Sequence, residues 1–200
     1  IVIPLYRTNE KFLREMIDSV KNQTYTNWEL CMADGSADGS LTGILEQYAA
    51  EDGRIHFTTL AANEGISGNT NAALEMAQGD YVVLADHDDI LPENALYELA
   101  EALNKDRTID VLYSDEDKIS MNGKKFFEPH FKSDYNLDLL CSMNYICHLF
   151  AVKRSLQQEI GLFRQEYDGA QDYDFIFRCC EAAKNICHIP KILYHWRCHM

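Results

Sequence analysis

Short apolar runs alternate with helical hydrophobic patterns along the first part of the chain. The apolar runs have the length of buried strands and lie at residues 1–5, 28–33, 55–60, 81–85 and 109–113. After Asn9, which can cap a helix, the apolar residues that share one helical face are Phe12, Leu13, Met16, Ile17 and Val20. Further helices are predicted at residues 41–50, at 71–78 and after Pro92. This alternation predicts an α/β fold in which a mostly parallel sheet has helices on both faces.

The pattern changes after residue 117. Asn122-Gly123 is a hairpin turn signal. The elements predicted beyond it are extended segments at 126–131 and 145–152, a loop at 161–171, a helix at 172–183 and a strand at 188–194. The sequence starts inside a strand-like run and ends without a stop signal. We therefore expect residues 1–200 to form one domain that belongs to a longer protein.

The net charge of −14, from 32 acidic and 18 basic residues, excludes a general nucleic-acid partner, which needs a basic surface. It also weighs against a phosphorylated ligand. No apolar run reaches the length of about 18 residues that spans a bilayer, and we see no signal peptide. The seven cysteines are scattered without a CxxC pair, which predicts reduced thiols in a cytoplasmic protein and no zinc site.

Carboxylates gather where the predicted strands end. Asp34 follows the run at 28–33, and Asp86-His87-Asp88-Asp89 follows the run at 81–85. Asp115-Glu116-Asp117 follows the run at 109–113. Because ligands of open α/β sheets bind beyond the carboxyl ends of the strands, we expect these acids at the ligand-binding edge.

Asp86-His87-Asp88 is a D-x-D pattern that suits a divalent cation. Two carboxylates about 4 Å apart repel by ~4 kcal/mol at an effective dielectric constant of 20. Mn²⁺ or Mg²⁺ would remove that repulsion and could hold a diphosphate, which resolves the conflict with the negative charge. The alternative is a solvated acidic turn.

Other candidates each have a structural alternative. Asp34 could bind a nucleobase or form an Asx turn, and the loop around Gly65 could approach an anion or be a plain helix start. Asp172 could be a general base or an N-cap. Arg178 lies four residues after Asp174, which predicts a surface ion pair between them. His195 could complete a metal shell or be a packed side chain.

Taken together, these motifs resemble the family 2 glycosyltransferases, which have a GT-A fold, and the resemblance runs nearly end to end. It is carried by Ile1–Tyr6, Asp18-Ser19-Val20, Gln23-Thr24-Tyr25, Trp28-Glu29-Leu30, Asn63-Glu64-Gly65 with Asn71, Asp86–Asp89, Asp115–Lys118, Gln171–Asp174 and His195-Trp196-Arg197. The last three resemble a bacterial branch that makes surface polysaccharides and glycoprotein glycans. The chain departs from the common pattern at Gly35, Thr70 and Gln171, where many members have an acid, Arg and Glu.

The resemblance implies roles for these residues. The positions that would bind the nucleotide-sugar are Pro4, Tyr6, Asp34, Asn63, Gly65, Asn71 and Asp86. Asp172 matches the catalytic base, and Asp88 and His195 match metal positions. The implied GT-A domain, a Rossmann-like nucleotide-diphospho-sugar transferase fold with a mixed sheet, has a nucleotide-sugar half at 1–117 and an acceptor half at 118–200.

The resemblance implies an inverting, Mn²⁺- or Mg²⁺-dependent glycosyltransferase. It would move a sugar from a nucleotide-diphosphate donor, expected to be a UDP-sugar, to a hydroxyl of a glycan or glycoprotein. We expect it in the cytoplasm or at the inner face of the membrane, with a second copy or further domains of a larger enzyme as partners. One alternative is a non-catalytic nucleotide-binding or assembly module, which the departures at Thr70 and Gln171 favour. A phosphatase or nucleotidyltransferase would need a P-loop or a first-strand nucleophile, and neither is present.

Overall fold

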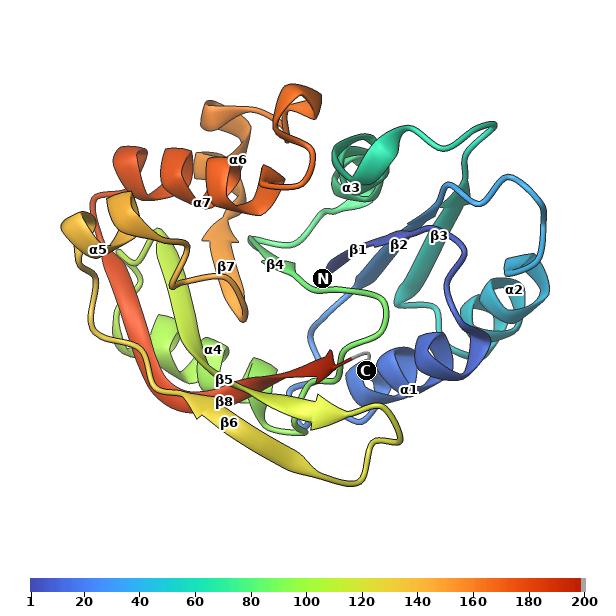
Figure 1. Cartoon of the computed structure of the whole chain (residues 1–200), viewed down its shortest axis with the longest axis horizontal. Coiled ribbons are helices and arrows are strands. Elements are labelled where there is room, and N and C mark those ends of the chain that lie inside the picture. Colours follow the sequence, from blue (N-terminus) through green and yellow to red (C-terminus); the bar gives the residue numbers. More distant parts are fainter. Residues whose placement is uncertain (199–200) are drawn as a thin grey trace.

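The computed structural model describes residues 1–198, which form one eight-stranded sheet between two layers of helices (Figure 1). The strands are β1 (Val2–Leu5), β2 (Leu30–Asp34), β3 (Ile55–Thr59), β4 (Tyr81–Leu84), β5 (Val111–Ser120), β6 (Phe126–His130), β7 (Phe150–Lys153) and β8 (Ile186–Cys198). Their order is β3-β2-β1-β4-β7-β5-β6, and β8 pairs with β5. Strands β1 to β4 are parallel, whereas β7 is antiparallel to both of its neighbours and β6 is antiparallel to β5. The predicted α/β fold with a mixed sheet is confirmed.

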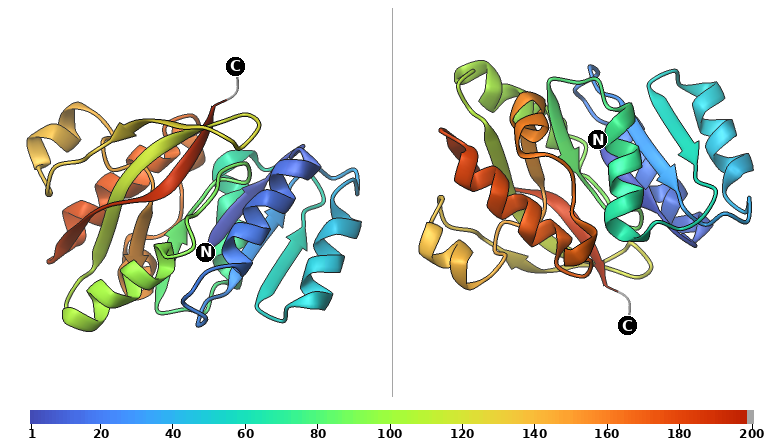
Figure 2. Two further views of the ribbon diagram at one scale, coloured as in Figure 1. Left: turned by 90° about the horizontal axis from the view of Figure 1, so that it is seen from below. Right: turned by 90° about the horizontal axis from the view of Figure 1, so that it is seen from above.

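The helices are α1 (Glu10–Lys21), α2 (Thr42–Glu51), α3 (Gly65–Met76), α4 (Ala95–Lys105), α5 (Leu137–Ser142), α6 (Arg154–Ile160) and α7 (Gln171–Ala182), with a 3-10 turn, η1, at Gln165–Tyr167. Helices α1, α2 and α4 cover one face of the sheet, and α3, α5, α6 and α7 cover the other. Figure 2 shows the two layers from opposite sides. No helix in the described part of the chain is long and apolar enough to cross a membrane.

Successive strand residues pack into opposite layers, which explains the continuous apolar runs in the sequence. Ile1, Ile3 and Leu5 pack against α1 and α2, whereas Val2 faces the other layer. In β4, Val83 points to the first layer, and its neighbours Val82 and Leu84 point to the second. A strand that is buried on both faces needs apolar residues at every position.

Asn9 caps α1 as predicted, because its side chain accepts a hydrogen bond from the Lys11 amide at 3.0 Å. We expect Asn9→Ala to lower the free energy of unfolding by ~1 kcal/mol, measured by urea denaturation. Asn94 is the matched control, since it lies at the N-cap of α4 but its side chain makes no cap hydrogen bond. An equal loss in Asn94→Ala would contradict the role assigned to the cap.

Several predicted boundaries are wrong. Helix α3 begins at Gly65 and not at residue 71. The acids Asp115, Glu116 and Asp117 do not follow β5 but lie inside it, and His195 lies inside β8. The reason is that β5 and β8 pair along their whole length, with Asp117 opposite His195. Residues 117 and 118, where the two expected functional halves meet, both lie in β5, and the division into halves stays a prediction.

The second half contains helices that the sequence pattern did not indicate. Residues 145–152 were expected to be extended, but the strand covers only Phe150–Lys153, with α5 before it and α6 directly after it. Both helices are short, at six and seven residues, and a short helix gives too few turns for a clear hydrophobic period.

Candidate active site

A small pocket at the carboxyl edge of the sheet brings together residues from both halves of the chain. Pro4 comes from β1, Asp86 follows β4, and Asp172 lies in the first turn of α7. His148 and Thr70 line the same pocket. Three of the residues predicted from the sequence, Pro4, Asp86 and Asp172, therefore share one cavity.

The Asp86–Asp89 loop is held by β8. The Tyr194 hydroxyl accepts a hydrogen bond from the Asp86 amide at 3.0 Å and donates to Asp89 Oδ2 at 2.6 Å. The Arg197 amide donates to the other Asp89 oxygen at 2.6 Å. Burial and the nearby Asp86 raise the pKa of Asp89 to about 7. Asp89 therefore anchors the loop through both of its carboxylate oxygens.

The buried guanidinium of Arg197 fixes the same loop from a second direction. Its Nε donates to the Asp88 carbonyl oxygen at 2.6 Å, and its other nitrogens reach the Met121 carbonyl and Glu15 Oε2. Arg197 is only 1% exposed. The sequence places Arg197 in the His195-Trp196-Arg197 motif but assigns it no role. Its role depends on partners that lie more than 70 residues away in the sequence, so sequence spacing could not reveal it.

His148 is a pocket residue that the sequence analysis missed. Its Nε2 lies 3.4 Å from Asp86 Oδ2, and its ring stacks on Tyr194 with 4.5 Å between the ring centroids. Burial disfavours the imidazolium, but Cys147 and Asp86 outweigh it and hold the pKa of His148 above its ordinary value. The pKa of Asp86 is correspondingly lowered, since His148 outweighs burial. The two side chains therefore form a charged pair that lines the pocket.

Asp172 is half-buried and is the second residue of α7, whose N-cap is Ala170. The alternative that Asp172 is the N-cap is therefore wrong. Burial raises the pKa of Asp172, with His148 opposing the rise and Asp86 adding to it. A carboxylate with a raised pKa is a better general base than an ordinary one.

The start of α7 is anchored by a different aspartate. Asp174 accepts hydrogen bonds from Arg178 at 2.9 Å, as the spacing of four residues predicts, and also from Arg164. These contacts tie the 161–170 segment to α7 and hold Asp172 at the pocket.

The predicted residues Asn63, Gly65 and Asn71 do not line the pocket themselves but lie in α3 and in the loop before it, and Asn71 holds the pocket residue Phe163. Asn71 Nδ2 donates to the Phe163 carbonyl and its Oδ1 accepts from the Phe163 amide, both at 2.9 Å. Asn63 Oδ1 accepts from the Gly65 amide at 3.2 Å and from Asn69 Nδ2 at 3.0 Å. The amide atoms of Asn71 are therefore engaged with the 161–170 segment.

Gly65 is required by this packing. Its φ is +77°, and a Cβ there would lie 2.5 Å from Asp168 Oδ2. We expect Gly65→Ala to lower the free energy of unfolding by roughly 2 kcal/mol, measured by chemical denaturation. Gly53→Ala is the control, because nothing lies within 4 Å of a Cβ at Gly53. Equal effects of the two substitutions would contradict this account.

The two remaining predicted nucleotide-binding residues lie at the ends of β1 and β2. Asp34 is fully buried, and its Oδ1 accepts from the Ser36 amide at 2.9 Å in an Asx turn. Its Oδ2 has no hydrogen-bond partner among residues 1–198. Tyr6 follows β1 and is 41% exposed. Asp34 thus forms the predicted Asx turn through Oδ1, and its Oδ2 could accept a hydrogen bond from a ligand.

The predicted metal residues are Asp88 and His195. Among residues 1–198, no three His, Cys, Asp or Glu side chains form a metal cage. Asp88 is half-buried in the loop after β4. The backbone of His195 forms an isolated antiparallel β-bridge with Ile90 at the end of that loop. His195 Nδ1 contacts Asp117 Oδ1 at 2.5 Å, the outer contact that metal-ligating histidines usually have. This donor set fits a cation that takes most of its ligands from a diphosphate and water.

Comparison with known proteins assigns the chain to a family. The sequence model described as "Glycosyl transferase family 2" matches residues 1–161. The chain belongs to glycosyl transferase family 2. The O-antigen biosynthesis protein RfbC of Myxococcus xanthus is 35% identical to this family 2 domain over 198 residues, which cover 98% of the chain and 16% of RfbC. An uncharacterized protein of Sinorhizobium fredii, y4gI, is 42% identical over 200 residues, which cover 98% of the chain and 22% of that protein.

The family 2 domain has the GT-A fold of a solved glycosyltransferase. It superposes on S. aureus TarS 1–349 in complex with UDP-GlcNAc with a TM-score of 0.79 and 23% identity, over 99% of this chain and 58% of TarS 1–349. The domain spans about a fifth of the length of the curated relatives named above.

Proposed function

We propose that this domain is an inverting glycosyltransferase that takes its sugar from a UDP-sugar. The observation that carries the proposal is the pocket in which Pro4, Asp86 and Asp172 meet. In this pocket, the carboxyl ends of β1 and β4, where a nucleotide-sugar would bind, meet the Asp172 carboxylate of α7. The crystal structure of TarS 1–349 in complex with UDP-GlcNAc supports a UDP-sugar as donor.

The donor would lie along the carboxyl edge of the sheet. Asp34 Oδ2, buried and without a partner in the described chain, is an acceptor suited to a nucleobase N–H, and Tyr6 can cover the base. Asn71 would act indirectly, by holding the pocket residue Phe163, and Asn63 and Gly65 fix the start of α3 beside it. Asp86, which His148 holds in its charged form, would accept a hydrogen bond from a ribose hydroxyl.

Asp172 would act as the base. It would take the proton from an acceptor hydroxyl, whose oxygen then bonds to the anomeric carbon as the bond to the diphosphate breaks. Attack opposite the leaving group inverts the anomeric configuration. The half-buried position of Asp172 and its raised pKa support this role.

Asp88 and His195 would hold a divalent cation, Mn²⁺ or Mg²⁺, at the diphosphate. The bound ion would supply positive charge to the departing diphosphate. The lack of a closed protein cage in residues 1–198 matches the way in which Mg²⁺ binds through one or two carboxylates and substrate phosphates.

The acceptor would be a hydroxyl of a glycan or glycoprotein. RfbC is named for O-antigen biosynthesis, and a chondroitin synthase of Escherichia coli is 30% identical over 198 residues, which cover 98% of this chain and 28% of that enzyme. Both names point to polysaccharide synthesis. All seven cysteines are free thiols, which supports a place in the reducing cytoplasm.

A thermal-shift screen of UDP-, dTDP- and GDP-sugars with Mn²⁺ tests the donor. A ligand that binds the folded state raises the melting temperature, so the UDP-sugars should give the largest rise. Release of free sugar from the same donor would then separate an enzyme from a non-catalytic assembly module. A screen in which no nucleotide-sugar shifts the melting temperature would refute the proposal.

A further inference from the structure

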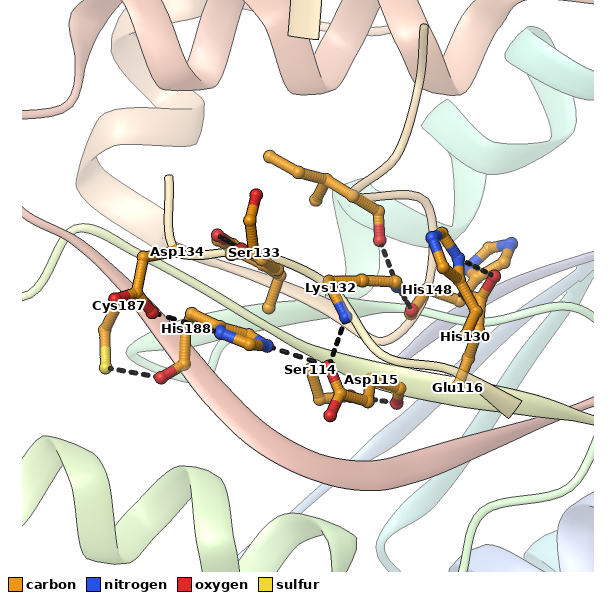
Figure 3. A network of polar contacts seen from close by, with 12 residues as sticks. Ser114, Asp115, Glu116, His130, Lys132, Ser133, Asp134, His148, Cys187 and His188 are labelled. Atoms are coloured by element: carbon orange, nitrogen blue, oxygen red, sulfur yellow. Dashed lines mark hydrogen bonds and ion pairs between the residues drawn. The ribbon is translucent and has the colours of Figure 1, made fainter. Parts of the chain in front are cut away.

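A fully buried ammonium group lies behind the candidate active site. Lys132 follows β6, and its side chain is 0% exposed. Its Nζ donates to Glu116 Oε2 at 3.1 Å, to the Ile146 carbonyl at 2.6 Å and to the His148 carbonyl (Figure 3). All three protons of the ammonium are therefore engaged.

The acceptors of this ammonium come from two separate parts of the chain. Glu116 lies in β5, whereas Ile146 and His148 belong to residues 143–149, which connect α5 to β7 without regular structure. The buried backbone groups of a segment outside helices and strands need partners elsewhere. The Ser114 amide of β5 donates to the Leu149 carbonyl at 3.1 Å, and the Lys132 ammonium joins the carbonyls of Ile146 and His148 to Glu116 of the same strand.

The backbone of Lys132 is fixed as well. Its amide donates to Asp115 Oδ1 at 2.9 Å, and His188 Nε2 lies 2.9 Å from the same oxygen. His188 in turn stacks on Tyr113 and contacts Asp134 at 3.2 Å, so that the cluster continues to the surface (Figure 3). The position of the ammonium is thus set from both ends of the residue.

His148 connects the cluster to the pocket. Lys132 holds its carbonyl oxygen, while its ring lies against Tyr194 and reaches Asp86 at 3.4 Å. A shift of the 143–149 segment would move the ring away from Asp86. Lys132 itself does not line the pocket.

We propose that Lys132, together with Glu116, is a positioning residue of the nucleotide-sugar site that acts by holding His148 against Asp86. The proposal rests on the proposed function for the part that Asp86 plays in donor binding. The two residues set the geometry of the donor site without contacting the donor.

The first test removes both buried charges at once. Lys132→Met with Glu116→Gln avoids leaving one buried ion without its counter-ion, which would destabilise the protein. We expect the dissociation constant of UDP, measured by calorimetry with Mn²⁺, to rise about tenfold. Lys191→Met is the control, because it removes a surface ion pair with Glu98 away from the site and should leave UDP binding unchanged. An unchanged dissociation constant in the folded double variant would overturn the proposal.

A second test asks whether Lys132 acts through His148. His148→Phe removes the contact with Asp86 but keeps an aromatic ring against Tyr194. If Lys132 acts through His148, the Lys132→Met/Glu116→Gln pair should cost no further UDP affinity in the His148→Phe background. Losses that add in full would mean that the cluster supports the fold and not the imidazole, and would overturn the proposal.

A third measurement separates this proposal from the proposed function. The imidazole nitrogen chemical shifts of His148 in the protein without nucleotide report its contact with Asp86, so they need no donor binding. We expect these shifts to change in Lys132→Met/Glu116→Gln, and unchanged shifts would overturn the positioning role. If that variant does not fold, Glu116→Gln alone leaves an amide oxygen for the ammonium and should move the same signals less, but in the same direction. A wild-type protein that binds no UDP would instead refute the proposed function.

Discussion

Asp172→Asn should reduce sugar transfer strongly while leaving donor binding intact. The amide has the size of the carboxylate but cannot accept the proton of the acceptor hydroxyl, so we expect kcat to fall roughly 10²- to 10⁴-fold. The dissociation constant of UDP should stay unchanged, because Asp172 would act on the acceptor. Transfer is measured with a labelled UDP-sugar and binding by calorimetry.

The matched control is Asp138→Asn. Asp138 is the second residue of α5, as Asp172 is of α7, but it is exposed and does not line the pocket. It should leave kcat unchanged. Full turnover in Asp172→Asn would show that another group is the base.

The same base predicts a pH dependence. Burial raises the pKa of Asp172, so the carboxylate is protonated and inactive at a higher pH than an ordinary aspartate. Transfer should therefore fall as the pH drops through this raised pKa, and the residual transfer of Asp172→Asn should lack this acidic limb. A wild-type rate that stays constant down to the usual pKa of aspartate would contradict the assignment.

The sequence predicted most reliably where the signal was local. The runs at 1–5 and 81–85 contain β1 and β4, because strands buried on both faces need uninterrupted apolar residues. The cap at Asn9 and the ion pair of Asp174 with Arg178 depend on neighbours within four residues. These features follow from spacing alone.

The features that the sequence missed depend on distant partners. Helix α3 starts early because its first turn packs on the 161–170 segment, where the Ser67 amide donates to Asp168 Oδ1, 101 residues away. Asp115, Glu116 and Asp117 have the appearance of a ligand cluster, but the fold supplies Lys132, His188 and His195 from elsewhere to pair with them. The strand register sets Asp117 opposite His195, and Lys132 comes from the segment after β6, so sequence spacing reveals none of these pairs.

This pairing changes how the net charge of −14 bears on function. The acids of β5 are paired with basic side chains within the protein, and Asp89 is held by Tyr194 and Arg197. These acids therefore do not by themselves call for a cation. We therefore base the expected metal site on the Asp86-His87-Asp88 motif and not on the net charge of the chain. Substitution of Asp88 tests it.

Asp88→Ala should remove the dependence of UDP binding on divalent metal. If Asp88 holds the cation that bridges to the diphosphate, Mn²⁺ should strengthen UDP binding to the wild-type domain, and the variant should bind UDP equally with and without Mn²⁺. We expect the dissociation constant in Mn²⁺ to rise about a hundredfold, which corresponds to ~2.7 kcal/mol. Calorimetric titration with UDP, with and without Mn²⁺, measures both effects.

Asp80→Ala is the matched control for this experiment, because Asp80 is an exposed aspartate at the opposite end of β4. It removes the same charge from the protein, so any general effect of net charge on nucleotide binding appears in it as well. The metal dependence of UDP binding should persist in Asp80→Ala. If Mn²⁺ strengthens UDP binding equally in Asp88→Ala and in the wild type, the cation is held elsewhere, and the D-x-D turn is then a structural loop fixed by Tyr194 and Arg197.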